Sequence, residues 1–444
     1  MVLALPEEAF GAFDTGDTAW IVTSAALVLL MTPGLAFFYG GLARGKSVLN
    51  MMMMSFISLA TVSVVYVLWG FSMAFGNGIT GDDDIAGLFS NPFALFGSGQ
   101  LADTIPGPDD TELVVTGGLS IPSFVFMGFQ LTFAVITVAL ISGALAERVK
   151  FATWTVFTVI WATVVYFPLS HMVWGGGIMS GAENGFASWM FGSTDGEANV
   201  APIDFAGGTV VHINAGMAAL VLALVVGARA GFGRTAYRPH NIPFVMLGAA
   251  LLWFGWFGFN AGSELAADAV TGLVWVNTTA ATAAAMIGWL AVELVRDKHA
   301  TSVGAASGIV AGLVAITPAC GALTPVGSLI LGVIAGALAA LAIGMKNKFG
   351  YDDSLDVVGV HLVAGLWGTV GIGFLAKDVG LFWGGDYKQL VVQVVIALFA
   401  LVFTGVLTAV IAFALKPLGW RVSDEDEKSG IDEAEHAETA YELA

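Results

Sequence analysis

Two histidines, His212 and His361, stand inside otherwise apolar stretches of this 444-residue chain. An ionisable side chain within a membrane-length apolar segment is expensive to bury, so such residues are candidates for function. Paired imidazoles can hydrogen-bond ring to ring while both stay neutral, one as donor and the other as acceptor. Because histidine titrates near neutral pH, the pair also offers a path for a proton. We therefore expect the two histidines to form a polar line through a dry passage for a small polar solute.

The sequences around the two histidines are similar. An acidic residue stands near the start of each segment, Asp204 in one and Asp356 in the other, and each histidine begins the pattern His-x-x-Ala-Gly. The glycines of this pattern, Gly216 and Gly365, lie one helical turn further on, where a small residue lets helix backbones pack closely. The two segments are five spans apart and so cross a membrane in opposite directions. This is typical of an inverted repeat with its site near the midplane.

The residues alone leave other roles open. A single buried histidine can simply be satisfied by neighbouring backbone, but two at matching places favour a functional pair. A metal site would need further ligands, and the chain has one cysteine, Cys320, and no His-Glu-x-x-His pattern, so we predict no metal and no cofactor. Asp204 precedes two glycines at the start of its span, where a carboxylate can cap a helix. We weigh this capping role above direct proton transfer.

The elements that position these residues are predicted to be membrane-spanning helices. The chain is 57% hydrophobic and only 11% charged, whereas soluble domains carry about 25% charged residues. A run of about 20 apolar residues spans a bilayer. We predict an all-α polytopic membrane protein with eleven transmembrane helices, an inverted five-helix repeat plus one extra helix. The spans lie near 20–42, 51–75, 118–146, 151–173, 205–228, 242–262, 271–295, 302–320, 325–345, 357–376 and 389–415.

Lysine and arginine predict the orientation of these spans. When loops are assigned alternately to the two sides, 14 of the 16 basic residues fall on one side, and only Lys377 and Lys388 fall on the other. Basic loops face the cytoplasm, so the N-terminus is expected outside and the C-terminus inside. The start of the chain is acidic and lacks the basic and apolar regions of a cleavable signal peptide.

The predicted organisation has three parts. Residues 1–19 form an external N-terminus, residues 20–415 a membrane domain and residues 416–444 an acidic cytoplasmic tail. Within the membrane domain the repeat halves are about 20–228 and 242–376, and the extra helix is about 389–415. The long loop near 76–117 is acidic and external, and whether it folds as a cap is open. The sequence has no basic patch, so we do not expect nucleic acid as a partner.

Longer motifs carry a resemblance to a known family. They are Phe129-Gln-Leu-Thr-Phe133, Gly143-Ala-Leu-Ala-Glu147-Arg148, His171-Met-Val-Trp174-Gly-Gly-Gly, the two histidine segments, Pro239-His-Asn, Trp256-Phe-Gly-Phe259-Asn-Ala-Gly-Ser263 and Thr317-Pro-Ala-Cys320-Gly. In this order they resemble the Amt/Mep/Rh ammonium transporters, and the bacterial and archaeal Amt branch more than the Rh proteins. The resemblance covers nearly the whole chain.

The resemblance implies a homotrimer in the cell membrane with one pore in each subunit. It also implies site residues: an external ammonium site of Trp174, Phe133 and Ser263, a gate of Phe133 and Phe259, pore histidines His212 and His361, a vestibule acid Asp204, and weaker candidates Tyr166 and Thr317. Aromatic faces attract a cation, which suits an ammonium site, although each aromatic alone would more often be ordinary packing or part of an interfacial belt.

The resemblance implies a mechanism in which ammonium is captured, loses its proton and passes along the histidines as ammonia. We expect this transport to be electrogenic. A bare cation in a dry pore costs tens of kcal/mol, whereas removing a proton at neutral pH costs roughly 3 kcal/mol. The loop Arg44-Gly-Lys46 and the tail 428–441 resemble surfaces that meet a PII-type signalling protein in the family. A disordered acidic tail is the alternative.

Other functions remain from the sequence alone. An ammonium sensor that signals without significant flux is one, although no kinase or cyclase segment follows the last span in this sequence. A membrane enzyme with a metal held by the two histidines is another. Gas permeation through a Rh-like pore is a variant of transport.

Overall fold

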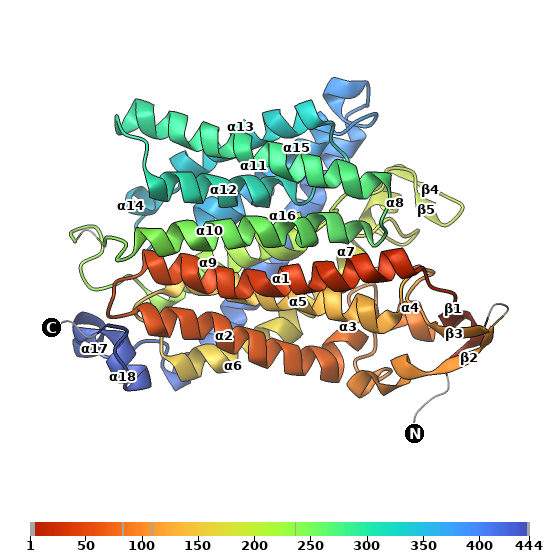
Figure 1. The fold of residues 1–444 in the computed structure, drawn as a ribbon, viewed down its shortest axis with the longest axis horizontal. Coiled ribbons are helices and arrows are strands. Elements are labelled where there is room, and N and C mark those ends of the chain that lie inside the picture. The colour runs from red at the N-terminus through yellow and green to blue at the C-terminus, as the bar shows by residue number, and fades with distance from the viewer. Residues whose placement is uncertain (1–4, 82–83, 108–109, 236, 442–444) are drawn as a thin grey trace.

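Long helices lie side by side along the longest axis of the molecule (Figure 1). This computed structural model describes residues 5–81, 84–107, 110–235 and 237–441. The strands β1 (Phe10–Gly11), β2 (Thr104–Gly107) and β3 (Asp110–Val114) lie at one end of the bundle, and the helices α17 (Asp424–Ser429) and α18 (Ile431–His436) at the other. We call these ends the strand side and the tail side.

Ten helical segments in the described residues are long and apolar enough to cross a membrane, and α12 is a shorter apolar helix. The prediction of eleven spans is confirmed, although the first helix begins at Thr15, before the expected residue 20. In chain order the segments are α1 (Thr15–Leu42), α2 to α3 (Val48–Phe75), α5 with η4 (Ser123–Leu145), α6 to α7 (Phe151–Trp174), η6 with α9 (Gly208–Val226), α10 with η7 and η8 (Ile242–Glu264), α11 (Ala269–Arg296), α12 (Ser302–Ile316), α13 with α14 (Pro325–Phe349), η9 with α15 (Val358–Leu375) and α16 (Lys388–Ala414).

The described residues of the segment 76–117 form short elements on the strand side (Figure 1). Strand β3 pairs antiparallel with both β1 and β2, and Phe10 is opposite Val114. Residues 82–83 and 108–109 of this segment lie outside the described part. The remaining short elements are η1 (Glu7–Ala9), α4 (Asn77–Thr80), η3 (Phe96–Ala102), α8 (Phe186–Phe191), β4 (Ser193–Thr194), β5 (Glu197–Ala198), η10 (Leu381–Trp383) and η11 (Lys416–Leu418).

Side-chain caps fix where several helices begin. Asp14 accepts a hydrogen bond from the Asp17 amide before α1, at 2.9 Å, and Asp268 forms a capping box with Thr271 before α11. Thr324 accepts from the amide of Gly327, and Pro325 follows it as the first residue of α13. Such residues satisfy amides that a helix start leaves without partners.

Five spanning segments contain π-helical turns, which are η2 (Tyr66–Gly70), η5 (Ala162–Tyr166), η6 (Gly208–Ile213), η7 (Phe257–Ala261) and η9 (Val358–Val363). A π turn adds a residue to the helix and re-aims the side chains around it, and such turns are frequent at functional sites. His212, Phe259 and His361 each lie in one of these turns. The local backbone therefore marks the same residues that the sequence singled out.

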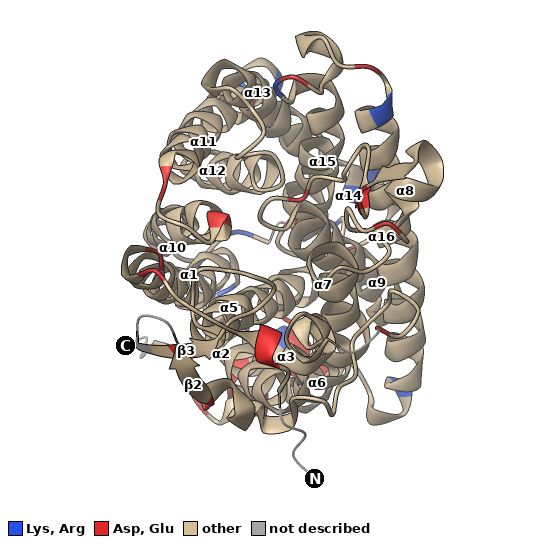
Figure 2. Cartoon of the chain, turned by 90° about the vertical axis from the view of Figure 1, so that its right-hand side faces the viewer, with Lys and Arg blue, Asp and Glu red and all other residues tan. Residues whose placement is uncertain are grey.

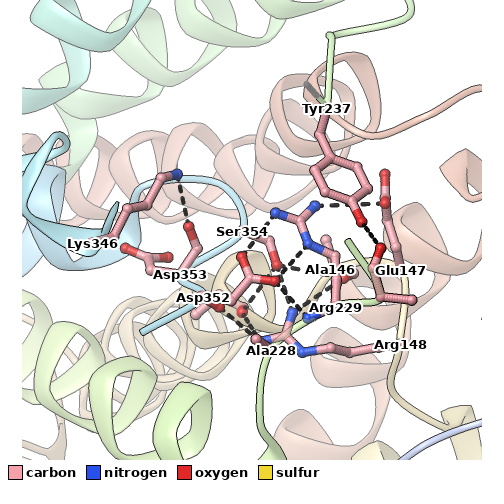
Figure 3. Close-up of polar contacts among 12 residues, drawn as sticks. Ala146, Glu147, Arg148, Ala228, Arg229, Tyr237, Lys346, Asp352, Asp353 and Ser354 are labelled. Carbon is pink, nitrogen blue, oxygen red and sulfur yellow. Dashed lines mark hydrogen bonds and ion pairs between the residues drawn. The ribbon is translucent and has the colours of Figure 1, made fainter. Parts of the chain in front are cut away.

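Seen along the helices from the strand side, charged residues lie mostly in connections and at helix ends (Figure 2). The tail side holds a buried exception (Figure 3). Arg148 is fully buried and donates hydrogen bonds to the carbonyl oxygens of Gly227, Ala144 and Asp352, at 2.9, 3.0 and 2.7 Å. Burial lowers the pKa of Arg148 to about 10, so it remains charged at neutral pH.

A second arginine, Arg229, extends the buried polar contacts around Arg148 (Figure 3) toward the first tail helix, α17. Arg229 forms a two-pronged ion pair with Asp352, with N–O distances of 2.8 and 2.9 Å, and lies over the ring of Tyr237. Glu147 lies between Arg229 and Arg44, at 3.5 and 2.7 Å. The neighbouring amide of Ala230 donates to the carboxylate of Glu427.

The tail is folded onto this face. Asp432 accepts hydrogen bonds from the amides of Leu49 and Asn50 at the start of α2, at 3.0 and 2.8 Å, and Glu435 accepts from Phe151 at the start of α6, at 2.8 Å. Acidic side chains are favourable at helix N-termini. The acids of the tail thus cap helices of the bundle.

Candidate functional site

The two histidines meet inside the bundle. His212 Nδ1 lies 3.3 Å from His361 Nδ1, the ring centroids are 5.4 Å apart, and both side chains are buried. A hydrogen bond between two Nδ1 atoms requires one ring to donate and the other to accept. His212 Nε2 has no hydrogen-bond partner among the described residues. The pair therefore presents a free polar atom in an otherwise apolar region.

Close packing of the two π-turn segments allows this contact. A Cβ at Gly216 would lie 2.5 Å from the backbone nitrogen of Leu362, and one at Gly365 would lie 3.1 Å from Cβ of His212. Glycine at these positions is what lets the two backbones approach, as the sequence indicated. The first span begins beside β1 on the strand side and successive spans alternate in direction, so the fifth span runs from the strand side to the tail side and the tenth runs back (Figure 1).

The acid that matches Asp204 is Asp353, and the pairing with Asp356 was wrong. Asp204 lies eight residues before His212, and Asp353 lies eight residues before His361. The Asp353 carboxylate accepts hydrogen bonds from the amides of Val357 and Val358, at 3.0 and 2.7 Å. Asp356 instead pairs with Lys346 at 2.6 Å. The inverted repeat is therefore clearer in the capping geometry than in the sequence.

The Asp204 carboxylate caps the start of η6. It accepts hydrogen bonds from the amides of Gly207, Gly208, Thr209 and Val210, at 3.0, 2.5, 2.9 and 3.2 Å, and from the hydroxyl of Thr209. The side chain is 9% exposed, and burial raises the pKa of Asp204 against the opposing effect of these bonds. The geometry is that of a helix cap.

Aromatic rings continue the line of the histidines toward the strand side. The rings of Phe133 and Phe259 stack with centroids 4.1 Å apart, and Phe259 lies 6.0 Å from the His212 ring. Trp174 meets Phe133 edge to face at 6.1 Å. The structure thus brings together five predicted residues in one column, with Trp174 partly exposed at one end and the two phenylalanines and the two histidines buried.

Two groups fix the strand-side end of this column. The indole nitrogen of Trp174 donates to the carbonyl oxygen of Asp204 at 2.9 Å. The Ser263 hydroxyl donates to the carbonyl oxygen of Phe259 at 2.7 Å, which leaves the lone pairs of its oxygen available as acceptors.

The two weaker candidates, Thr317 and Tyr166, make other contacts. Thr317 accepts from the indole nitrogen of Trp256 at 2.8 Å, and Trp256 stacks on His212 at 5.5 Å. Thr317 therefore contacts the histidine pair through Trp256, a residue that the sequence marks only as part of a motif. The ring contacts of Tyr166 are with Phe167.

These features define a class of protein. Membrane-length helices enclose a buried column of aromatic rings and paired imidazoles, and no group of three or more His, Cys, Asp or Glu residues in the described ranges could hold a metal ion. Such a column suits passage of a small solute through a membrane. The fold and site are those of a polytopic transport protein.

Comparison with known proteins gives the family. Residues 19–441 match the model of the Ammonium Transporter Family. An ammonium transporter of Mycobacterium tuberculosis is 52% identical over 98% of this chain and 92% of its own length, and one of Bacillus subtilis is 43% identical over 96% and 98%. A solved structure described as a sensor Amt protein has a TM-score of 0.81 at 28% identity and covers 95% of this chain and 98% of its own. The chain belongs to the ammonium transporter family, and it is a multi-pass membrane transporter, not an enzyme.

Proposed function

We propose that the protein binds ammonium at its strand side, removes a proton and conducts ammonia between the phenylalanines and along the histidines. The observation that carries this proposal is the continuous column, in which Trp174, Phe133, Phe259, His212 and His361 follow one another at ring distances of 4.1 to 6.1 Å. Ammonium is the substrate that family membership supports.

Trp174, Phe133 and Ser263 form the binding site for the cation in this proposal. Two aromatic faces attract ammonium, and the Ser263 oxygen offers a hydrogen-bond acceptor. Asp204, whose backbone carbonyl oxygen accepts from the Trp174 indole, adds the negative charge of its carboxylate to the vestibule in this proposal. Its main role is to hold this end of η6 in place, because each of its oxygens already accepts two or more hydrogen bonds.

The gate and the pore favour ammonia over ammonium. Phe133 and Phe259 stack at 4.1 Å, which leaves no room for a hydrated ion until the rings rotate. Beyond them a bare cation would cost tens of kcal/mol, whereas deprotonation costs roughly 3 kcal/mol at neutral pH. The free Nε2 of His212 and the shared contact between the histidines offer hydrogen bonds to ammonia and a route for the proton. Transport is electrogenic if the proton follows the same route.

The orientation and partners follow from the charge pattern and the family. We place the strand side outside the cell membrane and the tail in the cytoplasm, because the basic residues gather at the tail side. A homotrimer with one pore per subunit is the family's assembly. The loop 44–46 and the tail touch each other, since Lys46 donates to the carbonyl oxygen of Lys428 and Arg44 to that of Glu427. A PII-type protein would meet both as one surface.

The test is a current recording on reconstituted protein. A solid-supported membrane should give a transient, saturable current after an ammonium jump, and His361→Ala should abolish or alter it. His299→Ala is the matched control, because His299 is exposed on the tail side of the bundle. Absence of current together with alkalinisation of the vesicle interior, reported by an internal pH dye, would indicate neutral ammonia flux, because ammonia takes up a proton after it enters. Absence of both signals would contradict transport and favour a sensor.

A further inference from the structure

Two buried glutamines lie at the strand-side end of α16, the helix outside the inverted repeat. Gln389 and Gln393 are 4% and 0% exposed, and a spacing of four residues puts them on one face of the helix. A buried amide is costly unless its donors and acceptors are bonded. Their partners therefore show what this face of α16 holds.

Gln393 binds both backbone groups of a single residue. Its Oε1 accepts from the amide of Ile203 at 2.9 Å, and its Nε2 donates to the carbonyl oxygen of Ile203 at 2.8 Å. The same Nε2 donates to the carbonyl oxygen of Thr369 on α15, at 3.1 Å. Gln389 Nε2 donates to Gln393 Oε1 at 3.2 Å and to the carbonyl oxygen of Ala201 at 3.1 Å. Every donor and acceptor site of the Gln393 amide is thus used.

The segment held in this way leads directly into the site. Residues 201–207 form neither helix nor strand, so nothing regular fixes their path. Ile203 precedes Asp204, whose carbonyl oxygen accepts from the Trp174 indole at 2.9 Å and whose carboxylate caps η6. On the far side of Asp204, the amide of Phe205 donates to the carbonyl oxygen of Pro318 at 3.1 Å. Rotation of the backbone at Ile203 would move the acceptor that orients Trp174.

We propose that Gln393 is a positioning residue for the ammonium site: it clamps the backbone of Ile203 and thereby sets the orientation of Trp174 through Asp204. Gln389 supports the clamp by fixing the Gln393 amide. The inference rests on the proposed role of Trp174 in binding ammonium. It assigns to the eleventh span, which contributes no residue to the column, the task of holding the entrance.

The first test measures the current against ammonium concentration for Gln393→Met, a change that keeps side-chain length and removes the amide. The half-saturating ammonium concentration should rise about fivefold, equivalent to about 1 kcal/mol, while the maximal current stays within about twofold. Gln389→Met should give a smaller rise, about twofold, since Ile203 keeps both bonds. Thr408→Val is the matched control on the same helix, because it loses a buried bond to the Trp161 indole without touching segment 201–205. It should leave the half-saturating concentration unchanged.

The second test combines Gln393→Met with Trp174→Leu. If Gln393 acts through Trp174, the double variant should resemble Trp174→Leu alone, with less than about a twofold further rise. Three results would each overturn the proposal. The half-saturating concentration of the double variant could show the product of the two single effects; Gln393→Met could lower the maximal current without raising the half-saturating concentration; or Gln393→Met and Thr408→Val could give the same half-saturating concentration. If Gln393→Met does not fold, the cycle is measured with Gln389→Met, and the rise of about twofold expected of this single variant should then be absent when it is added to Trp174→Leu. If Trp174→Leu leaves the half-saturating ammonium concentration unchanged, the proposed binding site is wrong and the proposed role of Gln393 fails with it. If Trp174→Leu raises this concentration and Gln393→Met does not, only the proposed role of Gln393 is refuted.

Discussion

Replacing Asp204 with asparagine separates a structural role of this residue from a role in proton transfer. One carboxylate oxygen accepts from the amides of Gly207 and Gly208, at 3.0 and 2.5 Å, and the other from those of Thr209 and Val210, at 2.9 and 3.2 Å. Asparagine keeps one acceptor oxygen and turns the other into an NH₂ donor. Whichever way the amide turns, two backbone N–H groups lose their acceptor and face a donor.

The expected loss of unfolding free energy follows from the number of amides that lose their acceptor. A buried polar group left without a partner costs about 1–3 kcal/mol, so two amides give about 2–6 kcal/mol. Asp204 keeps 9% of its surface exposed, which favours the lower half of this range, and we expect Asp204→Asn to lose about 3 kcal/mol of unfolding free energy. Asp204→Ala removes all the acceptors and should lose more. A residue needed only to accept a proton would show the opposite pattern, with stability kept and transport lost.

The assay is an SDS or thermal unfolding titration of purified protein, with ammonium-jump currents recorded on the same preparations. Asp195→Asn is the matched control, because Asp195 is exposed in the turn between β4 and β5 and its positive φ of 53° suits asparagine. If Asp204→Asn keeps the wild-type unfolding free energy within about 0.5 kcal/mol and abolishes the current, the capping argument is wrong and Asp204 is a proton acceptor.

Three further variants test the tail side. Arg148→Met leaves several buried carbonyl oxygens without a donor and should cost about 3–5 kcal/mol in the same unfolding titration; a loss below about 1 kcal/mol would contradict this. Burial raises the pKa of Asp353 to about 6, above about 3.9 in the unfolded chain, so its contribution is fully present below about pH 4 and is lost as pH rises through 6. Relative to Asp353→Asn, the wild type should therefore lose unfolding free energy between pH 4 and 7, and parallel pH profiles would refute the assignment. Asp432→Ala removes the cap on α2, about 0.5–2 kcal/mol, and should speed trypsin cleavage of the tail, while the exposed Asp424→Ala should not; equal rates would mean that the acid does not hold the tail.

Apolar runs were enough to predict the spans, because a membrane-crossing helix must be apolar over nearly its whole length. The ends differ by a few residues, as at Thr15, where an N-cap at Asp14 extends the helix beyond the apolar run. The π turns have no comparable signal. The segments around His212 and His361 have ordinary apolar sequences, and their π turns lie where the two segments pack closely against each other.

The tail and the glutamines show a different limit. An acidic tail is typical of solvated chain, yet Asp432 and Glu435 find helix N-termini as partners, which depend on the packing of the bundle. Gln389 and Gln393 are polar residues in an apolar span, and that contrast alone could have marked them. What they hold could not be predicted, because Ile203 is nearly two hundred residues earlier in the chain.

The acids at the two ends of the histidine column explain why capping and cation attraction are difficult to separate. Asp204 and Asp353 each stand eight residues before one of the paired histidines, in segments that run in opposite directions. The start of a helix leaves several backbone N–H groups without hydrogen-bond partners, and a carboxylate can accept from more of them at once than other side chains can. The same requirement therefore puts a negative group near each end of the column, while the imidazoles between them can stay neutral. A substitution that keeps the shape but not the charge changes both properties, so stability and current have to be measured on the same variant.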